Sequence, residues 1–122
     1  MATSIETFFS AWGMSDDAAC ASAIDNCLAA SGRYADPKTD GILTGPAEVA
    51  DHVGAFSANA PGWTASVVTT GETAGMIRAT VAFGGKGPDG AEMVQHGQYF
   101  IRMDADGKIA EMIGFAGTGV PR

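Results

Sequence analysis

The sequence predicts an α+β fold, with helices in the N-terminal half of the chain and an antiparallel sheet in the C-terminal half. Before Pro61-Gly62, apolar residues recur at helical spacing behind residues that favour helix starts. After Pro61-Gly62, apolar and polar residues alternate between glycine-containing turns. The chain has 122 residues, so we expect one domain over residues 1–122, in which a curved sheet wraps over the helices.

The first helix is predicted to begin after Thr3, because Thr3 and Glu6 have the spacing of a capping box. We expect this helix to end near Gly13. Its apolar stripe consists of Ile5, Phe8, Phe9 and Trp12. The spacing of the stripe predicts that one face of the helix is buried.

A second helix is predicted to start at Ser15, with Asp16 and Asp17 at the positive end of its dipole. Gly32 is expected to end it. Its buried face is predicted to carry Cys20, Ile24, Cys27 and Leu28. At 1.5 Å per residue the two cysteines lie roughly 10 Å apart, which is too far for a disulfide.

A third helix is predicted to begin at Gly45-Pro46, because proline suits the first helical position. Its apolar face has the spacing i, i+3, i+4 and i+7 and carries Val49, His52, Val53 and Phe56. His52 is one of two histidines in the chain. A lone histidine on such a face is either a core residue with its hydrogen bonds satisfied or a catalytic group.

Strands are predicted at about residues 63–73, 76–83, 92–103 and 109–116. The connections between them are short, so we expect an antiparallel meander. In the segment 92–103, Tyr99 and Met103 project to one face and Phe100 to the other. Both faces are half apolar, which predicts a central strand that is covered on both sides.

Charge and composition exclude several classes of partner. Seven Lys and Arg against fourteen Asp and Glu give a formal charge of −7, which disfavours nucleic acid and anionic membrane surfaces. No apolar segment is long enough to span a bilayer, and no signal peptide is evident, so we expect a cytoplasmic protein. Two cysteines and two histidines also make a structural zinc site improbable, and we expect no metal. Gly84-Gly85-Lys86-Gly87 lacks the strand–loop–helix context of a phosphate loop and reads as a hairpin loop.

Asp36 is the candidate for acid–base chemistry. It precedes Pro37 where the chain leaves the helical region, so it is either a turn-forming residue or a functional carboxylate. If Asp36 and His52 face one apolar cavity, a carboxylate and an imidazole can exchange protons there near neutral pH. The apolar walls of such a cavity predict a raised pKa for Asp36.

Several motifs together resemble one protein family. They are the apolar helix stripe, Tyr34-Ala35-Asp36-Pro37, the segment from Gly45 to Val53, Pro61-Gly62, the turn from Met103 to Ile109, and Gly114-Phe115-Ala116-Gly117. In these motifs the chain resembles the SnoaL-like branch of the NTF2-like superfamily, which includes ketosteroid isomerases, polyketide cyclases and limonene-epoxide hydrolases. The resemblance implies a cone-shaped barrel of three N-terminal helices packed in a strongly bent, mostly antiparallel sheet, with a ligand cavity at its open end.

The resemblance also implies roles for individual residues. Asp36 matches the general base of the isomerases, and His52 is its expected partner or acid. Trp12 and Tyr99 match the positions of the oxyanion hole, with an altered set of donors. The expected catalytic residues are therefore Asp36, His52 and Tyr99, and the expected ligand-binding residues are Trp12, Tyr34, Phe56, Met103 and Met112.

These residues predict an isomerase, cyclase or dehydratase that needs no cofactor and acts on a small apolar carbonyl compound. A non-catalytic carrier of a small hydrophobic ligand and a dimeric interaction domain are the alternatives. We also expect a homodimer, because alternation in the last strand places Ile113 and Phe115 on the outer face of the sheet.

Overall fold

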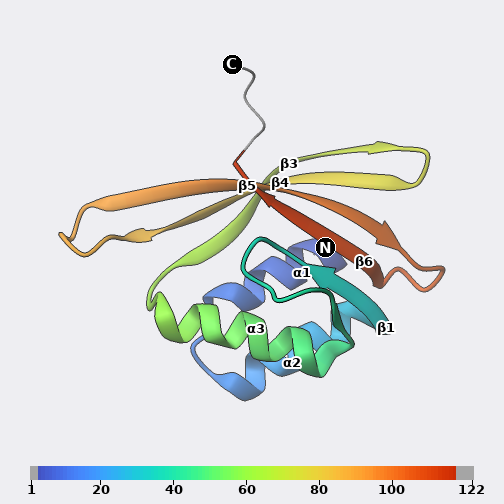
Figure 1. The fold of residues 1–122 in the computed structure, drawn as a ribbon, viewed down its shortest axis with the longest axis horizontal. Coiled ribbons are helices and arrows are strands. Elements are labelled where there is room, and N and C mark those ends of the chain that lie inside the picture. The colour runs from blue at the N-terminus through green and yellow to red at the C-terminus, as the bar shows by residue number, and fades with distance from the viewer. Residues whose placement is uncertain (1–2, 118–122) are drawn as a thin grey trace.

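The computed structural model describes residues 3–117 as three helices that lie under one face of a strongly twisted sheet (Figure 1). The helical elements are α1 (Ser4–Ser10), the short 3₁₀ helix η1 (Ala11–Gly13), α2 (Asp17–Cys27) and α3 (Pro46–Asn59). The strands are β1 (Leu28–Ala35), β2 (Leu43–Thr44), β3 (Thr64–Thr73), β4 (Met76–Lys86), β5 (Glu92–Met103) and β6 (Ile109–Ala116). The predicted α+β class is confirmed.

The six strands form one mixed sheet in the order β2-β1-β6-β5-β4-β3. Strands β3 to β6 make the predicted antiparallel meander. Strand β1 adds to the meander by pairing in parallel with β6. The N-terminal part of the chain therefore supplies a sheet strand as well as helices, and this strand leads directly to Asp36.

The prediction that the second helix continues to Gly32 is wrong. The helix ends at Cys27, and the chain becomes extended at Leu28. Gly32 lies inside β1, where a Cβ atom would come within 2.9 Å of the Ile109 carbonyl oxygen. This glycine is thus required by the close approach of β1 to β6, and it does not end a helix.

The helix starts are close to the predicted positions. The Thr3 hydroxyl accepts from the Glu6 N–H, and the Glu6 carboxylate accepts from the Thr3 N–H, so the capping box is confirmed. The cap of α2 is Asp16 and not Ser15, because the Asp16 carboxylate accepts from the Ala19 N–H. Cys20 and Cys27 are buried free thiols.

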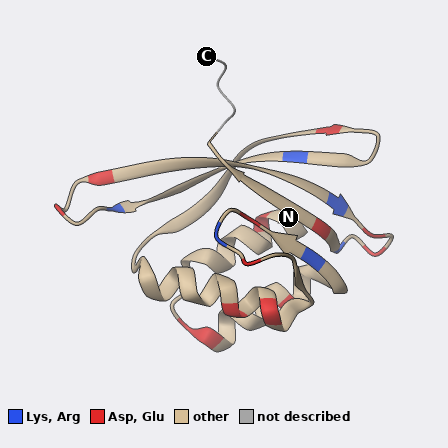
Figure 2. Cartoon of the chain, in the orientation of Figure 1, with Lys and Arg blue, Asp and Glu red and all other residues tan. Residues whose placement is uncertain are grey.

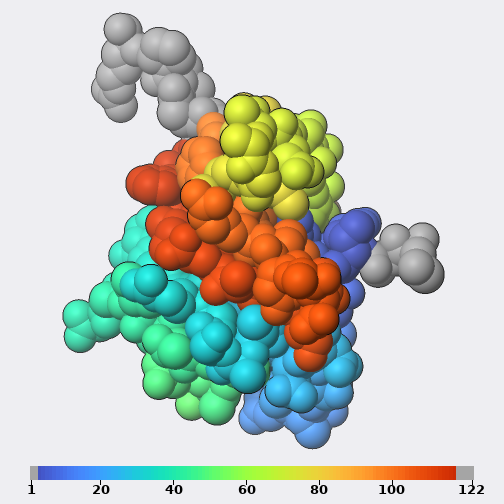
Figure 3. Space-filling view, turned by 90° about the vertical axis from the view of Figure 1, so that its right-hand side faces the viewer, coloured from blue at the N-terminus to red at the C-terminus, as the bar shows by residue number. Residues whose placement is uncertain are grey.

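The core lies between the helices and the concave face of the sheet. Along β5, Gly97, Tyr99 and Ile101 are buried, whereas Phe100 between them is 36% exposed. The prediction that β5 is covered on both faces is therefore wrong for this chain, because the helices cover one face only. In Figure 3 the β3–β4 hairpin, in yellow-green, lies above the orange β5–β6 segment, and the helices lie below it.

The turn between β4 and β5 is shorter than the sequence indicates. Gly84 and Gly85 continue β4 and pair with Val94 and Met93 of β5. A Cβ atom on Gly85 would lie 2.5 Å from the Trp63 indole, so the missing side chain lets that ring pack flat on the strand. Among residues 3–117, no helix is long and apolar enough to cross a membrane.

Candidate active site

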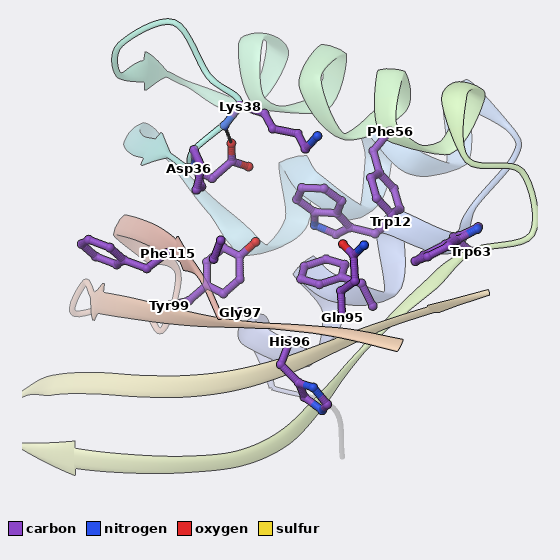
Figure 4. A pocket seen from close by; sticks show the side chains of 13 residues that line it. Trp12, Asp36, Lys38, Phe56, Trp63, Gln95, His96, Gly97, Tyr99 and Phe115 are labelled. Carbon is purple, nitrogen blue, oxygen red and sulfur yellow. Dashed lines mark hydrogen bonds between the residues drawn. The ribbon is translucent and has the colours of Figure 1, made fainter. Parts of the chain in front are cut away.

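A cavity lies between α3 and the concave face of β4 and β5 (Figure 4). One part of it has a volume of about 150 Å³ and adjoins a wider hollow of about 480 Å³. The residues that line both parts are Trp12, Asp36, Lys38, Phe56, Trp63 and Gln95. The space is sufficient for a small organic molecule.

Aromatic rings form most of the wall. The Trp12 ring lies 5.0 Å from the Phe56 ring and 5.6 Å from the Phe83 ring, both edge-on. Trp12 stands in η1, and its carbonyl accepts from the Ser57 hydroxyl of α3 at 2.8 Å. This bond fixes the end of the first helical segment against α3, which holds the indole in the cavity.

Asp36 and His52 meet at the floor of the cavity. Asp36 follows the last residue of β1, and His52 comes from the middle of α3. His52 Nε2 lies 2.8 Å from Asp36 Oδ2, and the two side chains are only 19% and 7% exposed. The structure therefore brings the predicted pair into direct contact. The cavity is not the largest hollow, however, since one of about 630 Å³ lies between α1 and β3.

Four donors surround the Asp36 carboxylate. Oδ2 accepts from the Tyr34 hydroxyl at 2.5 Å and from His52. Oδ1 accepts from the backbone N–H groups of Lys38 and Thr39 at 2.8 and 3.1 Å. The backbone bonds make the turn that an Asp-Pro step favours, so the turn-forming interpretation of Asp36 is confirmed.

The prediction of a raised pKa for Asp36 is wrong. Burial does raise the pKa, but hydrogen bonds from His52, Tyr34 and the Lys38 N–H, together with the charge of His52, outweigh it and leave the pKa lowered. Asp36 is therefore a carboxylate at neutral pH. Because it can only accept, His52 Nε2 carries the proton of their hydrogen bond.

Two buried tyrosines complete this polar floor. The Tyr99 hydroxyl points towards Asp36 (Figure 4). Burial raises the pKa of Tyr99, hydrogen bonding to Tyr34 lowers it, and the Asp36 charge raises it, with a net upward shift. Burial also raises the pKa of Tyr34. Both phenols stay protonated at neutral pH and act as donors. Gly114 makes room for the Tyr99 ring, since a Cβ atom there would lie 2.4 Å from Cε2.

Trp12 carries an unsatisfied donor. Its indole Nε1 is buried and has no hydrogen-bond partner within residues 3–117, and the residue is 3% exposed. An unpaired buried donor costs about 1–3 kcal/mol. The indole N–H is therefore placed for an acceptor that the protein itself does not supply.

The remaining predicted ligand-binding residues divide into two groups. Phe56 lines the cavity, as predicted, and Tyr34 contributes its hydroxyl from below. Met103 instead lines the hollow beside α1 and β3, and Met112 is fully buried in the core. Met112 lies next to Tyr34 across β1 and β6, but it is packed in the core and does not line the cavity.

The lining residues that the sequence-based site lacks include Lys38, Trp63, Phe83 and Gln95. Alternation along β5 was a usable signal for Gln95, which shares a face with Tyr99. His96 also borders the cavity, but its ring leaves β5 on the opposite side and points away from Asp36 (Figure 4). Within residues 3–117, no three His, Cys, Asp or Glu side chains gather as metal ligands would.

Comparison with known proteins places this geometry in a family. The family model of the SnoaL-like domain matches residues 5–112. The chain belongs to the SnoaL-like family. No curated protein matches it by sequence.

Solved structures show the same NTF2-like fold. A SnoaL-like protein from Agrobacterium tumefaciens, proposed to be an isomerase, is similar with a TM-score of 0.78 and 21% identity, over 94% of this chain and 95% of that one. A protein from Jannaschia sp. CCS1, proposed to be a SnoaL-like polyketide cyclase, has a TM-score of 0.70 and 15% identity, over 92% and 83% of the two chains. An epoxide hydrolase from M. tuberculosis has a TM-score of 0.66 and 14% identity, over 93% and 80%.

Proposed function

We propose that this SnoaL-like protein binds a small, largely apolar carbonyl compound and moves a proton on it, as in isomerisation, cyclisation or dehydration. The observation that carries the proposal is the 2.8 Å contact between Asp36 and His52 at the floor of an aromatic cavity. Buried acid–base pairs of this kind cluster at functional sites. The apolar wall suits the hydrocarbon part of such a compound.

His52 is the group that exchanges the proton with the ligand. Its Nε2–H is committed to Asp36, so Nδ1 is the ring atom left to act as base and then as acid. Asp36 orients the imidazole and balances its charge. As the direct base, Asp36 would first have to release one of its four donors, so the geometry favours this division of roles over the one inferred from the sequence.

Trp12 is the unoccupied donor for the ligand oxygen, and Tyr99 joins it when its O–H turns from the Tyr34 oxygen towards the ligand. Removing a proton next to a carbonyl places negative charge on that oxygen, and fixed donors in a dry site stabilise it. The Trp12 N–H has no partner among the described residues. The raised pKa of Tyr99 keeps its phenol protonated while the charge develops.

The similar structures include a proposed isomerase, a proposed polyketide cyclase and an epoxide hydrolase. Isomerisation, cyclisation and epoxide hydrolysis are different reactions. One fold thus hosts several chemistries, and the reaction has to be argued from the side chains. The side chains here supply a proton carrier and oxygen donors. They support proton transfer without a cofactor.

A carrier function is the second candidate, and the four hydrogen bonds on Asp36 favour it. A carboxylate with every side occupied is also what a purely structural turn would show. A carrier would bind the same ligands without altering them.

Hydrogen–deuterium exchange tests the proposal without knowledge of the natural product. The probe is 2-tetralone, a bicyclic ketone with exchangeable protons beside its carbonyl, followed by proton NMR in D₂O. We expect the wild-type protein to accelerate exchange and His52→Gln to reduce the acceleration by about 10²–10⁴-fold, the usual contribution of a positioned proton-transfer group.

The matched control is His96→Gln, since His96 is the other histidine of the chain and points away from Asp36. This variant should exchange the probe at the wild-type rate. Equal losses in both variants, or wild-type exchange in His52→Gln, would contradict the proposed role of His52. Binding of 2-tetralone without accelerated exchange would favour the carrier.

A further inference from the structure

Lys38 is a second donor at the cavity that has no described partner. Its backbone N–H is fixed by Asp36, and Figure 4 shows its side chain reaching back over the cavity, with the ammonium group above Trp12. The chain has fourteen Asp and Glu, yet none within residues 3–117 forms an ion pair with Lys38. What distinguishes Lys38 is its place, because it lines both parts of the cavity.

Lys38 and Trp12 line both parts of the same cavity. One offers an ammonium group at the mouth, and the other offers a buried N–H deeper inside. Both are donors and neither can accept a hydrogen bond. The polar part of the ligand therefore has to supply acceptor atoms to two places.

We infer that the ligand is an aromatic or alicyclic carboxylate whose charged group lies on Lys38 Nζ, which leaves Trp12 Nε1 for the carbonyl oxygen of the same molecule. Its apolar part would lie against the rings of Phe56 and Phe83. A charge-assisted bond from lysine to a carboxylate is stronger than a neutral one. This inference rests on the proposed function and narrows its substrates to keto acids and related anions.

A neutral carbonyl compound fits the cavity less completely. One carbonyl oxygen satisfies Trp12 but leaves the Lys38 ammonium without a counter-charge. A carboxylate at this mouth supplies the counter-charge, and the low dielectric of the aromatic wall strengthens the attraction.

A cationic ligand is the opposite possibility, since an aromatic cavity with a carboxylate at its floor can hold a quaternary ammonium group. Two features of the site disfavour a cationic ligand. The Asp36 oxygens already accept from His52, Tyr34 and two backbone N–H groups. The Lys38 ammonium would also repel a second cation at the mouth.

The test compares three probes with the same ring system, 2-naphthoate, 2-acetonaphthone and 2-naphthylmethylamine, by isothermal titration calorimetry at pH 7. We expect 2-naphthoate to bind most tightly. In Lys38→Met its affinity should fall by about tenfold or more, while that of 2-acetonaphthone stays within about twofold, because only the carboxylate uses the ammonium.

Lys108→Met is the matched control, because it removes the same charge in the β5–β6 turn and Lys108 is not a lining residue. It should leave the affinity for 2-naphthoate within about twofold. Added salt should weaken 2-naphthoate binding in the wild type more than in Lys38→Met.

Three outcomes would overturn the inference. Equal affinities for 2-naphthoate and 2-acetonaphthone, with 2-tetralone still exchanged, would reject the carboxylate and leave the proposed function intact. Tightest binding of the amine would show a cation site instead. Failure of all three naphthyl probes and of 2-tetralone would reject the proposed function together with the inference.

Discussion

The two faces of the sheet share the same strands but differ in how far their side chains are buried. Adjacent residues of β5 show the contrast, since Tyr99 is 4% exposed on the concave face and Phe100 is 36% exposed on the convex face. On the concave side the helices cover the strands and leave the aromatic cavity. On the convex side the Phe100 and Phe115 rings contact each other edge-on at 5.8 Å, and no helix covers them.

This contrast shows what alternation along a strand does and does not specify. A period of two separates residues into two faces, and here both faces carry large apolar side chains. Which face is buried depends on where the helices dock, and that is a property of the whole chain. The concave face combines burial with polar donors, whereas on the convex face Phe100 lies between Arg78 of β4 and Ile113 of β6. Figure 2 shows the charged residues mostly towards the ends of the strands and in the turns.

Truncation of neighbouring β5 residues is the strongest test of this difference. Ile101 is fully buried on the concave face, so Ile101→Ala should lower the free energy of unfolding by about 2–5 kcal/mol. Phe100→Ala removes a larger but exposed side chain and should cost less than about 1 kcal/mol. Urea denaturation followed by circular dichroism, at about 1 µM protein to limit self-association, measures both. Similar losses would mean that both faces are buried.

The fold was predictable to the extent that its signals are local. The capping box at Thr3, the proline start of α3 and the turns of the meander each depend on residues close in sequence. Strand β1 was missed because its pairing with β6 joins Tyr34 to Met112, and its sequence LAASGRYA continues the apolar spacing of the helix before it. Its parallel partner, far along the chain, determines its conformation.

The candidate site was predictable in its residue types and less so in its electrostatics. The Asp-Pro step and the apolar face of α3 identify Asp36 and His52, which the structure brings together. The lowered pKa of Asp36 depends on a hydroxyl, an imidazole and two backbone N–H groups arriving at one carboxylate. Lys38 was missed because a loop lysine has no sequence signature that says where its side chain turns.

Acid should weaken the concave face specifically. The pKa of Asp36 is lower in the folded chain than in an unfolded one, so its ionisation stabilises the fold above the unfolded pKa of about 4, and this stabilisation is lost as the pH falls through the folded value. At neutral pH Asp36→Asn should cost about 1–3 kcal/mol, because it disrupts hydrogen bonds to a charged group.

The measurement is the free energy of unfolding of the wild type and of Asp36→Asn between about pH 6 and pH 3. We expect the gap between the two proteins to narrow as the pH falls. On the convex side, Glu111→Gln removes an exposed ion pair with Arg33 at 3.8 Å and should cost less than about 1 kcal/mol at neutral pH. A gap for Asp36→Asn that does not change with pH would contradict the lowered pKa.

The smallest effect on folding is expected for the convex apolar patch, defined by Phe100, Ile113 and Phe115. We propose that a second copy of the chain covers it, because Phe115 is 56% exposed and its ring contacts that of Phe100 on the face that no helix covers. Phe115→Ser should change the free energy of unfolding at low concentration by less than about 0.5 kcal/mol, since little surface is buried there in one copy.

In sedimentation equilibrium at about 50 µM, the wild type should be a dimer and Phe115→Ser a monomer. Ser66→Ala, on the exposed edge strand β3, is the control and should remain dimeric. A wild type that is monomeric at this concentration would leave the convex face without the partner proposed for it.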